Sequence, residues 1–515
     1  MRFEELATAS REIASTRSRL KKIERLASLL KGMSAEELTP SVALLAGEPR
    51  QGRIGVGGAL LGRLFSQPSA SEPTVSIAEV DAVLERFAAI AGRGSARERE
   101  VLLGALFARL TEHEREFLSG ALGGGLRQGA LEAIVLEAVA SAADLPVEAL
   151  RRALLFAGSV HVVAREALVN GAPGLEKFSL TLFQPLRPML ADSAQTLEEA
   201  LEHEAHAAIE YKLDGARIQV HKRGEDVAVF SRQGQDVTQR VPELVASVRA
   251  FGAHELILDG EAIALDANGR PLPFQTTMQR FGRQKNVEET RLALPLSQMY
   301  FDCLYRDGAL LVDQPNSERF LALRDSIEPS LVVPRHVVED LPSAQRFVSS
   351  ALEAGHEGVL VKSLRAAYDA GRRGSSWLKL KPVHTLDLVV LAVERGNGRR
   401  QGFLSNIHLG ARDPRTGGFV MLGKTFKGMT DAMLSWQTKR FQELAVNDSG
   451  YVVTLRPEVV VEVAFDGVQE SSQYPGGLSL RFARVKSYRE DKRPDEADTI
   501  DRVREIFERS RGGPG

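Results

Sequence analysis

Hydrophobic residues in the first third of the chain follow the period of an α-helix. Leucine, isoleucine and alanine recur at helical spacing in four stretches, at residues 13–30, 80–91, 102–110 and 131–142. Helix-start signals agree with this period, because three pairs fit a capping box, namely Ser34 with Glu37, Ser95 with Glu98 and Thr111 with Glu114. No strand-like alternation of any length precedes about residue 175. The pattern therefore predicts an all-helical N-terminal part.

Downstream of about residue 185 the apolar positions indicate β-strands as well as helices. Two prolines within residues 183–191 mark a linker into a new domain. Apolar, β-branched runs then predict strands at residues 207–211, 217–222, 227–230, 256–265, 299–305 and 358–362. Helical periods predict helices at residues 242–251, 317–327 and 343–354. This mixture predicts an α+β domain, with a hairpin closed by the turn at residues 223–226.

Beyond residue 382 the sequence becomes rich in strand patterns again. These patterns lie at residues 386–394, 403–411, 419–426 and 457–465, and one good helix pattern covers 431–444. Short strands with an interposed helix are typical of an OB-fold. We expect a charged, exposed tail beyond Pro494 and disorder at residues 512–515. The chain thus divides into a helical domain (1–185), an α+β domain (186–382) and an OB-fold domain (383–515).

Composition narrows the class of protein. A chain of 515 residues is too long for one core, and 43% hydrophobic with 26% charged residues describes an ordinary soluble protein. Cys303 is the single cysteine, which excludes disulfides within the chain and cysteine-rich zinc sites and suits a reducing cytoplasm. The N-terminus lacks the order of a signal peptide, and no apolar run is long enough to cross a bilayer. With a net charge of −2, any contact with nucleic acid must depend on local basic patches.

The most informative stretch is the octet at residues 210–217. Lys212 stands two residues before Asp214, Gly215 follows, and Arg217 closes the stretch, with Val/Ile-rich strand patterns on both sides. A lysine at a strand end before a glycine turn is held in a pocket, and nearby cations make its amine a better nucleophile toward phosphorus or carbonyl carbon. The alternative is a surface turn of charged residues. The octet alone leaves both interpretations open.

Two glycine-rich turns interrupt the predicted helices, at residues 51–57 and 123–129. Glycines allow close approach of the backbone, and the N-terminus of a following helix offers free N–H donors to an anion. Tight packing between helices would explain the same glycines. Both explanations stay open at the level of the residues.

The octet resembles the nucleotidyl-lysine motif of the covalent nucleotidyltransferases, which include ATP-dependent DNA ligases, RNA ligases and mRNA-capping enzymes. Further motifs of this superfamily recur in the family order at residues 231–234, 258–261, 300–302, 357–362, 377–382 and 480–492. Each fragment alone has a plain structural explanation, such as a hairpin turn or a solvated edge strand. Their order favours the resemblance. With the long helical N-terminal part, it points to the three-domain ATP-dependent DNA ligases.

The resemblance implies that Lys212 carries AMP as a phosphoramidate. Glu210 and Phe301 would read adenine, while Lys379 and Lys381 would face the α-phosphate. The family's nucleotide-binding positions fall on Glu210, Arg217, Arg232, Glu261, Phe301, Arg373, Lys379, Lys381, Arg489 and Lys492. The resemblance thus predicts an ATP pocket built from strand ends.

Other matching positions imply a metal and DNA. Glu261 and Glu357 would hold Mg²⁺, which prefers hard oxygen ligands, and Arg489 to Lys492 would orient pyrophosphate. Ala483 stands where many relatives have proline, while the charged residues of the motif are kept. Backbone amides of the glycine-rich turns would hold duplex phosphates, at Gly55, Gly57, Gly125, Arg127 and Gly129. We therefore expect a monomer that encircles nicked double-stranded DNA.

The implied activity is nick sealing by three phosphoryl transfers, in the cytoplasm and near the nucleoid in a bacterium or archaeon. The motifs are shared with RNA ligases and capping guanylyltransferases, but these need no large helical clamp. A catalytically inactive clamp is the other alternative, and the intact lysines and glutamates oppose it. The sequence leaves open a role in replication, in repair or as a supplementary ligase, and it shows no sign of a zinc site or a membrane segment.

Overall fold

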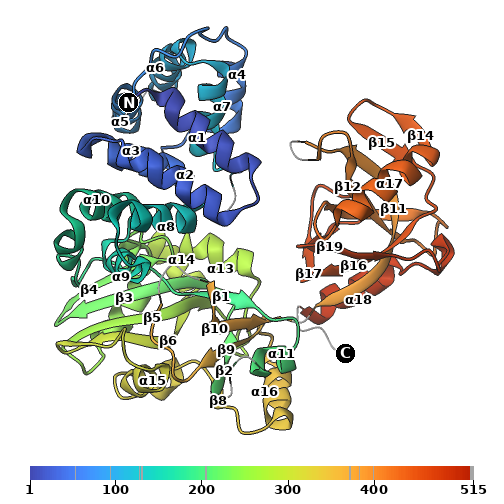
Figure 1. The fold of residues 1–515 in the computed structure, drawn as a ribbon. Helices are drawn as coiled ribbons and strands as arrows, with labels where there is room; N and C mark the ends of the chain where they lie inside the picture. The colour runs from blue at the N-terminus through green and yellow to red at the C-terminus, as the bar shows by residue number, and fades with distance from the viewer. Residues whose placement is uncertain are drawn as a thin grey trace.

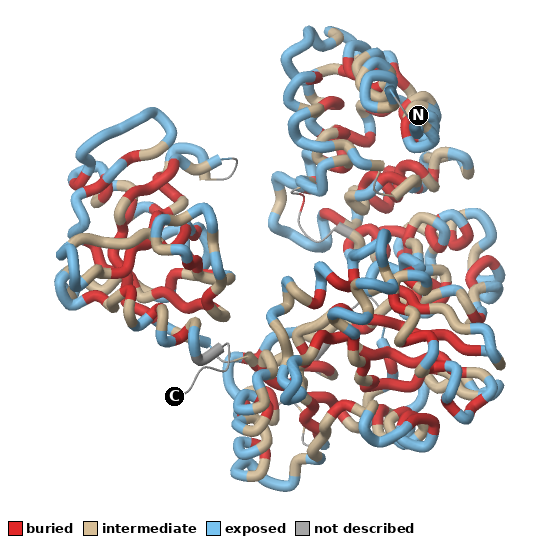
Figure 2. Tube along the Cα trace, turned by 180° about the vertical axis from the view of Figure 1, so that it is seen from behind, coloured by how far each residue is buried: buried red, intermediate tan, exposed pale blue. Residues whose placement is uncertain are grey.

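The computed structural model describes residues 1–510 except 53, 93, 127, 129–130, 203, 205, 370–372, 382 and 398–399. It consists of a helical, an α+β and a β-rich part (Figure 1). Buried segments run through the centre of each part and exposed loops surround them (Figure 2). Within the described residues, no helix combines the length and apolar character needed to cross a membrane. The predicted fold class, with all-α, α+β and OB-fold domains, is confirmed.

The helical part is built around one hydrophobic core. All predicted helices are present, although residues 13–30 are divided between two helices because Ser18 caps a new start. The capping boxes at Ser34 and Thr111 are confirmed. The third is wrong, because Gly94 (φ 88°) is the N-cap and Ser95 is already helical. The helices are α1 (Phe3–Ser15), α2 (Arg19–Lys31), α3 (Ala35–Leu45), α4 (Gly58–Phe65), α5 (Ile77–Ala89), α6 (Ser95–Arg109), α7 (Glu112–Leu122), α8 (Leu131–Ala143), α9 (Val147–Ala157) and α10 (Val160–Glu176).

The α+β part contains two five-stranded sheets. Its strands are β1 (Leu190–Ser193), β2 (Ala207–Lys212), β3 (Ala216–Arg223), β4 (Asp226–Ser231), β5 (Glu255–Ala264), β6 (Leu296–Arg306), β7 (Ala309–Leu310), β8 (Arg335–Val337), β9 (Gly358–Ser363) and β10 (Arg373–Leu380). The first sheet has the order β1-β10-β9-β2-β8 and the second the order β4-β3-β5-β6-β7. The predicted hairpin is confirmed, since β3 and β4 pair antiparallel. Strand β1, which the sequence did not predict, pairs in parallel with β10.

Helices cover both sheets of this part. They are α11 (Leu197–Glu202), α12 (Pro242–Arg249), α13 (Phe274–Phe281), α14 (Val287–Ala293), α15 (Asn316–Arg324) and α16 (Leu341–Glu353). Leu244 of α12 packs in one cluster with residues of the second sheet, and Ala344 of α16 packs with residues of the first sheet. The three predicted helices correspond to α12, α15 and α16. The two sheets therefore have separate apolar layers and meet along their remaining faces.

The C-terminal part is a strand-rich domain centred on one long strand. Its elements are β11 (His384–Arg395), β12 (Leu404–Arg412), β13 (Phe419–Thr425), α17 (Asp431–Glu443), β14 (Ala445–Asp448), β15 (Val452–Leu455), β16 (Val460–Phe465), β17 (Gly467–Glu470), β18 (Leu478–Arg481), β19 (Arg484–Tyr488) and α18 (Ile500–Ser510). β11 pairs with β12, β15 and β16. The expected exposed tail beyond Pro494 is wrong, because Ile500, Val503 and Ile506 of α18 are buried in the domain core. Residues 512–515 lie outside the described part.

The helical and α+β parts are joined by the linker that the two prolines indicated. The N–H of Phe183 donates to Nδ1 of His221 on β3 (3.0 Å). Leu155 and Phe156 at the end of α9 belong to the same hydrophobic cluster as Phe301. The helical part thus contributes to the core beneath the second sheet. The boundaries at residues 185 and 382 stay predictions.

Candidate active site

Three neighbouring strands of the first sheet bring charged residues to one edge. β2 ends at Lys212, β9 begins directly after Glu357, and β10 ends directly before Lys381. Lys212 lies opposite Gly358 in the antiparallel register, and the N–H of Glu357 donates to the carbonyl of Lys212 (3.1 Å). The ammonium groups of Lys212 and Lys381 both donate to the carboxylate of Glu357. The structure therefore unites residues that the sequence offers in three separate motifs.

Two glycines allow the backbone to close around this edge. A Cβ at Gly215 would lie 2.4 Å from the carbonyl oxygen of Ala262 and 2.8 Å from Cγ of Glu261. A Cβ at Gly358, whose φ is +142°, would lie 2.2 Å from the carbonyl oxygen of Leu380. Neither position has room for a side chain. The glycine that follows Lys212 and Asp214 is therefore required by the close approach to β5.

The second sheet supplies an arginine and an aromatic ring. The guanidinium of Arg217 on β3 donates to Asp259 (2.7 Å) and to the carbonyl of Met189 (2.7 Å). It also lies 5.4 Å from the ring centroid of Phe301 on β6. Arg217 is paired in register with Glu261 on β5. These contacts fix the arginine beside the aromatic ring.

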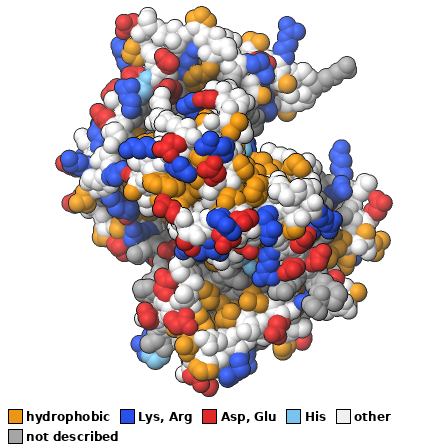
Figure 3. All heavy atoms as spheres, turned by 90° about the vertical axis from the view of Figure 1, so that its right-hand side faces the viewer, with side chains coloured by type: hydrophobic (Ala, Val, Ile, Leu, Met, Phe, Trp, Pro, Cys, Tyr) orange, Lys and Arg blue, Asp and Glu red, His pale blue; other side chains and the backbone are white. Residues whose placement is uncertain are grey.

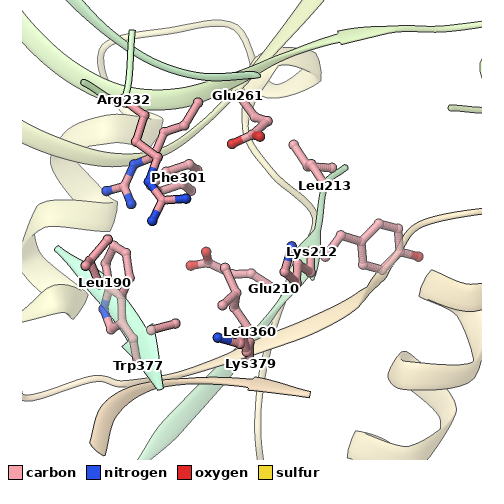
Figure 4. Close-up of a pocket in the computed structure, with 13 residues that line it drawn as sticks. Leu190, Glu210, Lys212, Leu213, Arg232, Glu261, Phe301, Leu360, Trp377 and Lys379 are labelled. Carbon is pink, nitrogen blue, oxygen red and sulfur yellow. The ribbon is translucent and has the colours of Figure 1, made fainter. Parts of the chain in front are cut away.

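A pocket of about 200 Å³ collects these side chains (Figure 4). The predicted site residues that line it are Glu210, Lys212, Arg217, Arg232, Glu261, Phe301 and Lys379. The other lining residues are Leu190, Ala191, Tyr211, Leu213, Leu360 and Trp377. The pocket therefore combines a cationic edge with an apolar, aromatic wall.

Burial and neighbouring charges set the ionisation of the acidic groups. Burial raises the pKa of Glu261 to about 7, although Lys212 pulls it down. Burial and the charge of Glu357 raise the pKa of Asp214. Burial opposes ionisation of Glu357 as well, but Lys212 and Lys381 outweigh it and lower the pKa of that carboxyl. Glu357 thus holds its negative charge through the two lysines.

Family models match all three parts of the chain. The model "ATP dependent DNA ligase domain" matches residues 188–381, "ATP dependent DNA ligase C terminal region" matches 400–492, and "DNA ligase N terminus" matches 66–140. A relative named "Probable DNA ligase" from Anaeromyxobacter sp. (strain Fw109-5) is 57% identical over 511 residues, which cover 99% of this chain and 98% of the relative. The chain belongs to the ATP-dependent DNA ligases.

Another ligase relative and a solved structure agree with this assignment. A "Probable DNA ligase" from Mycolicibacterium paratuberculosis (strain ATCC BAA-968 / K-10) is 52% identical, with 98% of this chain and 97% of the relative covered. The solved structure named "Pmar-Lig_Pre." has a TM-score of 0.62 at 19% identity and covers 94% of this chain and 99% of its own. At that identity the solved structure supports the fold alone.

The ligase family implies Mg²⁺, and the donor set beside Lys212 fits this ion. Glu261 and Glu357 both lie close enough to Lys212 that its charge lowers the pKa of their carboxyl groups, and both offer hard oxygen donors. Among the described residues, no group of three or more His, Cys, Asp or Glu side chains is placed to hold a metal. Mg²⁺ usually takes one or two carboxylates and completes its shell with water and substrate phosphates. Two carboxylates therefore suit an ion that arrives with a nucleotide.

The C-terminal domain places one arginine near the ligase pocket. Nη1 of Arg481 on β18 lies 3.9 Å from the carboxylate of Asp214. By contrast, Arg489 and Lys492 both donate to Asp387 of β11, at 3.0 and 2.5 Å. These two residues are thus ion-paired within the C-terminal domain. Their predicted contact with pyrophosphate stays a prediction.

Two further predicted arginines belong to the nucleotide-binding set. Arg232 directly follows β4, is exposed and lines the pocket. Arg373 begins β10, and its side chain lies outside the described part of the structure. Arg232 is therefore at the pocket, and the role of each arginine stays a prediction.

The two glycine-rich turns of the ligase's helical part lie next to each other. Gly55 has a φ of +77°, and Gly57 is the N-cap of α4. A Cβ at Gly123 in the second turn would lie 3.7 Å from Leu61 of α4. Within these turns the N–H groups of Gly52 and Gly125 already donate to the carbonyls of Pro49 and Gly120, so a contact with phosphates would have to use other backbone N–H groups there.

A buried glutamine within the second turn holds it against neighbouring helices. The carbonyl of Gln128 accepts from Nζ of Lys22 (2.6 Å), and its side chain bonds to Ser10 and to the carbonyl of Leu45. Gly125 donates to a carbonyl of α7. Arg127 and Gly129 lie outside the described residues. The anchor at Gln128 was not predicted from the sequence.

Sequence reasoning missed most of the apolar pocket wall. Leu360 and Trp377 stood inside quoted motifs, and alternation along β9 and β10 could have assigned them to the pocket. Leu190 and Ala191 belong to the linker segment, and nothing in their sequence predicts that β1 pairs with β10. Tyr368, whose hydroxyl donates to Asp259 (2.5 Å), lies in no motif that would assign it to the site.

Proposed function

We propose that this protein joins the strands at a nick in duplex DNA, using ATP and an AMP held covalently on Lys212. The observation that carries the proposal is the placement of the Lys212 ammonium group. It stands at the edge of the pocket, against Glu357, and Lys381 donates to the same carboxylate. The same pocket contains Phe301, a ring on which adenine would stack.

In the first step the neutral amine of Lys212 would attack the α-phosphorus of ATP. A nitrogen–phosphorus bond forms as the bond to the pyrophosphate oxygen breaks, so AMP remains on the enzyme and pyrophosphate leaves. Lys379, Lys381 and Arg217 would balance the charge that develops on the phosphoryl oxygens. The same cations favour loss of the Lys212 proton before attack.

In the second step the 5′-phosphate at the nick would attack the phosphorus of the lysine-bound AMP, which frees Lys212 and forms a pyrophosphate link between AMP and DNA. In the third step the 3′-hydroxyl would attack the 5′-phosphate, and AMP would leave. The hydroxyl proton passes to solvent or base. The net reaction converts ATP and a nick into AMP, pyrophosphate and a sealed strand.

Mg²⁺ held by Glu261 and Glu357 would supply positive charge at the phosphates. Arg489 and Lys492 are candidates to orient pyrophosphate. They are paired with Asp387, so these ion pairs would have to open before either residue could bind pyrophosphate. We propose this change as part of self-adenylation.

We propose that the helical domain (1–185) grips duplex backbone while the α+β domain (186–382) and the OB-fold domain (383–515) complete a clamp around it. Acidic and basic side chains are intermixed on the face shown in Figure 3, which agrees with the net charge of −2. Backbone amides at the two glycine-rich turns would provide sequence-independent contacts with phosphates. We propose that the protein acts on DNA as a monomer in the cytoplasm, where ATP is available.

A sealing assay tests the proposal. A labelled nicked duplex should be converted to the continuous strand with ATP and a divalent metal, and the protein should take up label from α-labelled ATP. NAD should not replace ATP. Labelling from GTP in place of ATP, or sealing of nicked RNA alone, would favour a capping-type enzyme or an RNA ligase. Absence of labelling by either nucleotide would indicate an inactive clamp.

Gln128→Ala tests the grip of the helical part. Loss of its bonds to Ser10 and Leu45 should loosen the second turn and weaken binding to nicked duplex by about three- to tenfold, since one such bond contributes about 1 kcal/mol. Self-adenylation should be unchanged. A matched control is Gln298→Ala, which removes another buried glutamine, on β6, bonded to Tyr300. Equal loss of DNA affinity in both variants would argue against a specific role of the second turn.

A further inference from the structure

A second carboxylate, Glu210, lies at the end of the pocket away from solvent. Its side chain is 0% exposed and is flanked by two cations. Nζ of Lys362 lies 2.5 Å from Oε2, and Nη1 of Arg335 donates to Oε1 at 3.1 Å. Each carboxylate oxygen is therefore held by a different cation. Glu210 still lines the pocket, and Figure 4 shows its carboxylate directed toward Phe301 and Trp377.

Lys362 is as fully buried as Glu210. Its side chain is 0% exposed, and its Nζ lies 4.6 Å from the ring centroid of Phe301 and 4.2 Å from that of Trp377. Nζ also donates to the carbonyl of Phe301 (3.4 Å). Burial lowers the pKa of Lys362, while the charges of Glu210 and Asp302 oppose that shift. A lysine in this position links the acidic group to the aromatic wall of the pocket.

Arg335 is fixed independently of Lys362. Its Nη2 donates to Oδ1 of Asn316 (2.9 Å), and its guanidinium lies 3.9 Å from the ring centroid of Phe320. Asn316 begins α15, whereas Lys362 belongs to β9. Glu210 is thus held in one orientation by contacts from two different elements.

Whether the Glu210 carboxyl accepts or donates hydrogen bonds decides which purine bases can bind next to it. An ionised carboxylate only accepts hydrogen bonds, and its two oxygens offer about four acceptor positions. Oε1 accepts from Arg335, while Oε2 is ion-paired with Lys362 but accepts no hydrogen bond from the described residues, which leaves acceptor positions for a ligand. The 6-amino group of adenine donates, whereas the 6-keto group of hypoxanthine or guanine accepts and would face the carboxylate unpaired. Such a buried, unpaired contact is strongly unfavourable.

We propose that Lys362 is a specificity-determining positioning residue, which holds Glu210 as an oriented, acceptor-only group and so selects 6-amino over 6-keto purine nucleotides. This inference rests on the proposed self-adenylation with ATP. Without Lys362, the buried carboxylate keeps one cation. It then either turns or takes up a proton, and a protonated carboxyl can donate to a 6-keto oxygen. Either change reduces the distinction between the two kinds of base.

The test compares self-adenylation by α-labelled ATP with labelling by α-labelled inosine triphosphate, which differs from ATP at the 6-position. The wild-type protein should prefer ATP. In Lys362→Met the ratio of kcat/KM for ATP to that for inosine triphosphate should fall about tenfold or more, which corresponds to about 1.4 kcal/mol. The fall should come from a higher KM for ATP and a gain with inosine triphosphate. A purely structural role would lower both rates in parallel.

Two further variants keep the test decisive. Lys222→Met removes another buried lysine of the same domain, whose Nζ donates to the carbonyl of Ala253 (2.6 Å), and should leave the ratio unchanged. Arg335→Met should lower the ratio in the same direction, and it decides the matter if Lys362→Met does not fold. An unchanged ratio in the folded variant, or an equal fall in Lys222→Met, would overturn this inference alone. Wild-type protein labelled by neither nucleotide would overturn the proposed function itself.

Discussion

Two glutamates in the α+β domain each lie between two cations, but in different surroundings. Glu357 is held by Lys212 and Lys381, and the three side chains are 17%, 21% and 21% exposed. Glu210 is held by Lys362 and Arg335, with exposures of 0%, 0% and 5%. The same chemical grouping therefore occurs once partly exposed, around Lys212 at the pocket wall, and once fully buried at the base of the pocket.

The difference in exposure decides whether the partners of each glutamate can be replaced by other groups. At the partly exposed group, water or a metal ion can replace an ammonium group as the partner of Glu357, because partly exposed ion pairs contribute little free energy. At the base, removal of one partner leaves an uncompensated buried charge, which is strongly unfavourable. We infer that the outer group, Glu357 with its two lysines, takes part in the phosphoryl transfer. The inner group, Glu210 with its two cations, fixes the geometry of the pocket.

Removal of Lys212 should have the largest effect on the outer group. Lys212→Ala should reduce transfer of label from α-labelled ATP by more than about a thousandfold, because no other group supplies the attacking amine. Lys212→Arg should fail as well, since guanidinium stays protonated. Thermal unfolding should change little in either variant. Strong residual labelling of a folded Lys212→Ala protein would contradict the covalent role.

Glu357→Ala and Lys362→Met contrast the two groups directly. Glu357→Ala should lower the rate of phosphoryl transfer by about a hundredfold with a smaller change in nucleotide affinity, since charge stabilisation acts mainly on the transition state. Its free energy of unfolding should change by less than about 1 kcal/mol. Lys362→Met should lose about 3–5 kcal/mol of unfolding free energy, because Glu210 is left with one cation. Equal loss of stability in urea titrations of both variants would remove the proposed distinction.

Gly215→Ala tests whether backbone packing supports the outer group. Because a Cβ would meet the carbonyl of Ala262 and Cγ of Glu261, the substitution should lower the free energy of unfolding by about 1–3 kcal/mol and displace Glu261. Gly252→Ala is the control, since a Cβ there meets nothing within 4 Å. Thermal melts and adenylation rates report both effects. A variant as stable and active as Gly252→Ala would show that β3 and β5 can move apart.

His221 is buried and neutral, so it shows how burial of an uncharged titratable group affects stability, in comparison with the two charged groups. Burial lowers its pKa to about 3, whereas the unfolded chain takes up a proton near about 6.5. The unfolded state therefore binds more protons between these values. The contribution of His221 to stability is complete above pH 6.5 and is lost as pH falls toward 3, by up to about 1.4 kcal/mol per unit.

His221→Gln should remove this part of the pH dependence. Urea titrations at pH 7, 6 and 5 should show a smaller decline in unfolding free energy for the variant than for wild type. Parallel declines would mean that His221 is already protonated in the folded protein. Between pH 7 and pH 5 the difference in decline should reach about 2 kcal/mol, from about 1.4 kcal/mol per pH unit below pH 6.5.

The outer group could be predicted from the sequence, and the inner one only in part. Lys212, Glu357 and Lys381 stand at strand ends in motifs that follow the order of the nucleotidyltransferases, and this resemblance, not the local pattern alone, assigned them. Glu210 was expected to read adenine, but its partners Lys362 and Arg335 were not. Their role depends on the order of β8, β2 and β9 in the sheet, which local hydrophobic periods do not encode.

Local signals failed where a competing contact decided the structure. Ser95 and Glu98 fit a capping box, yet Gly94 in the left-handed region begins the helix one residue earlier. Charged residues beyond Pro494 suggested an exposed tail, although Ile500, Val503 and Ile506 recur at a spacing that gives a helix one apolar face. In that case the period was present and the high charge obscured it.

The position of Leu155 and Phe156 has a consequence for how this protein can be taken apart or recombined. Both side chains come from α9 of the helical part, yet they complete the cluster that contains Phe301 and Trp377. An exchange of helical domains between relatives at residue 185 would therefore replace part of the apolar cluster against which Phe301 and Trp377 of the pocket pack. The smallest interchangeable module is the helical and α+β parts together, and the C-terminal domain, which has its own core, is the piece that can be exchanged by itself.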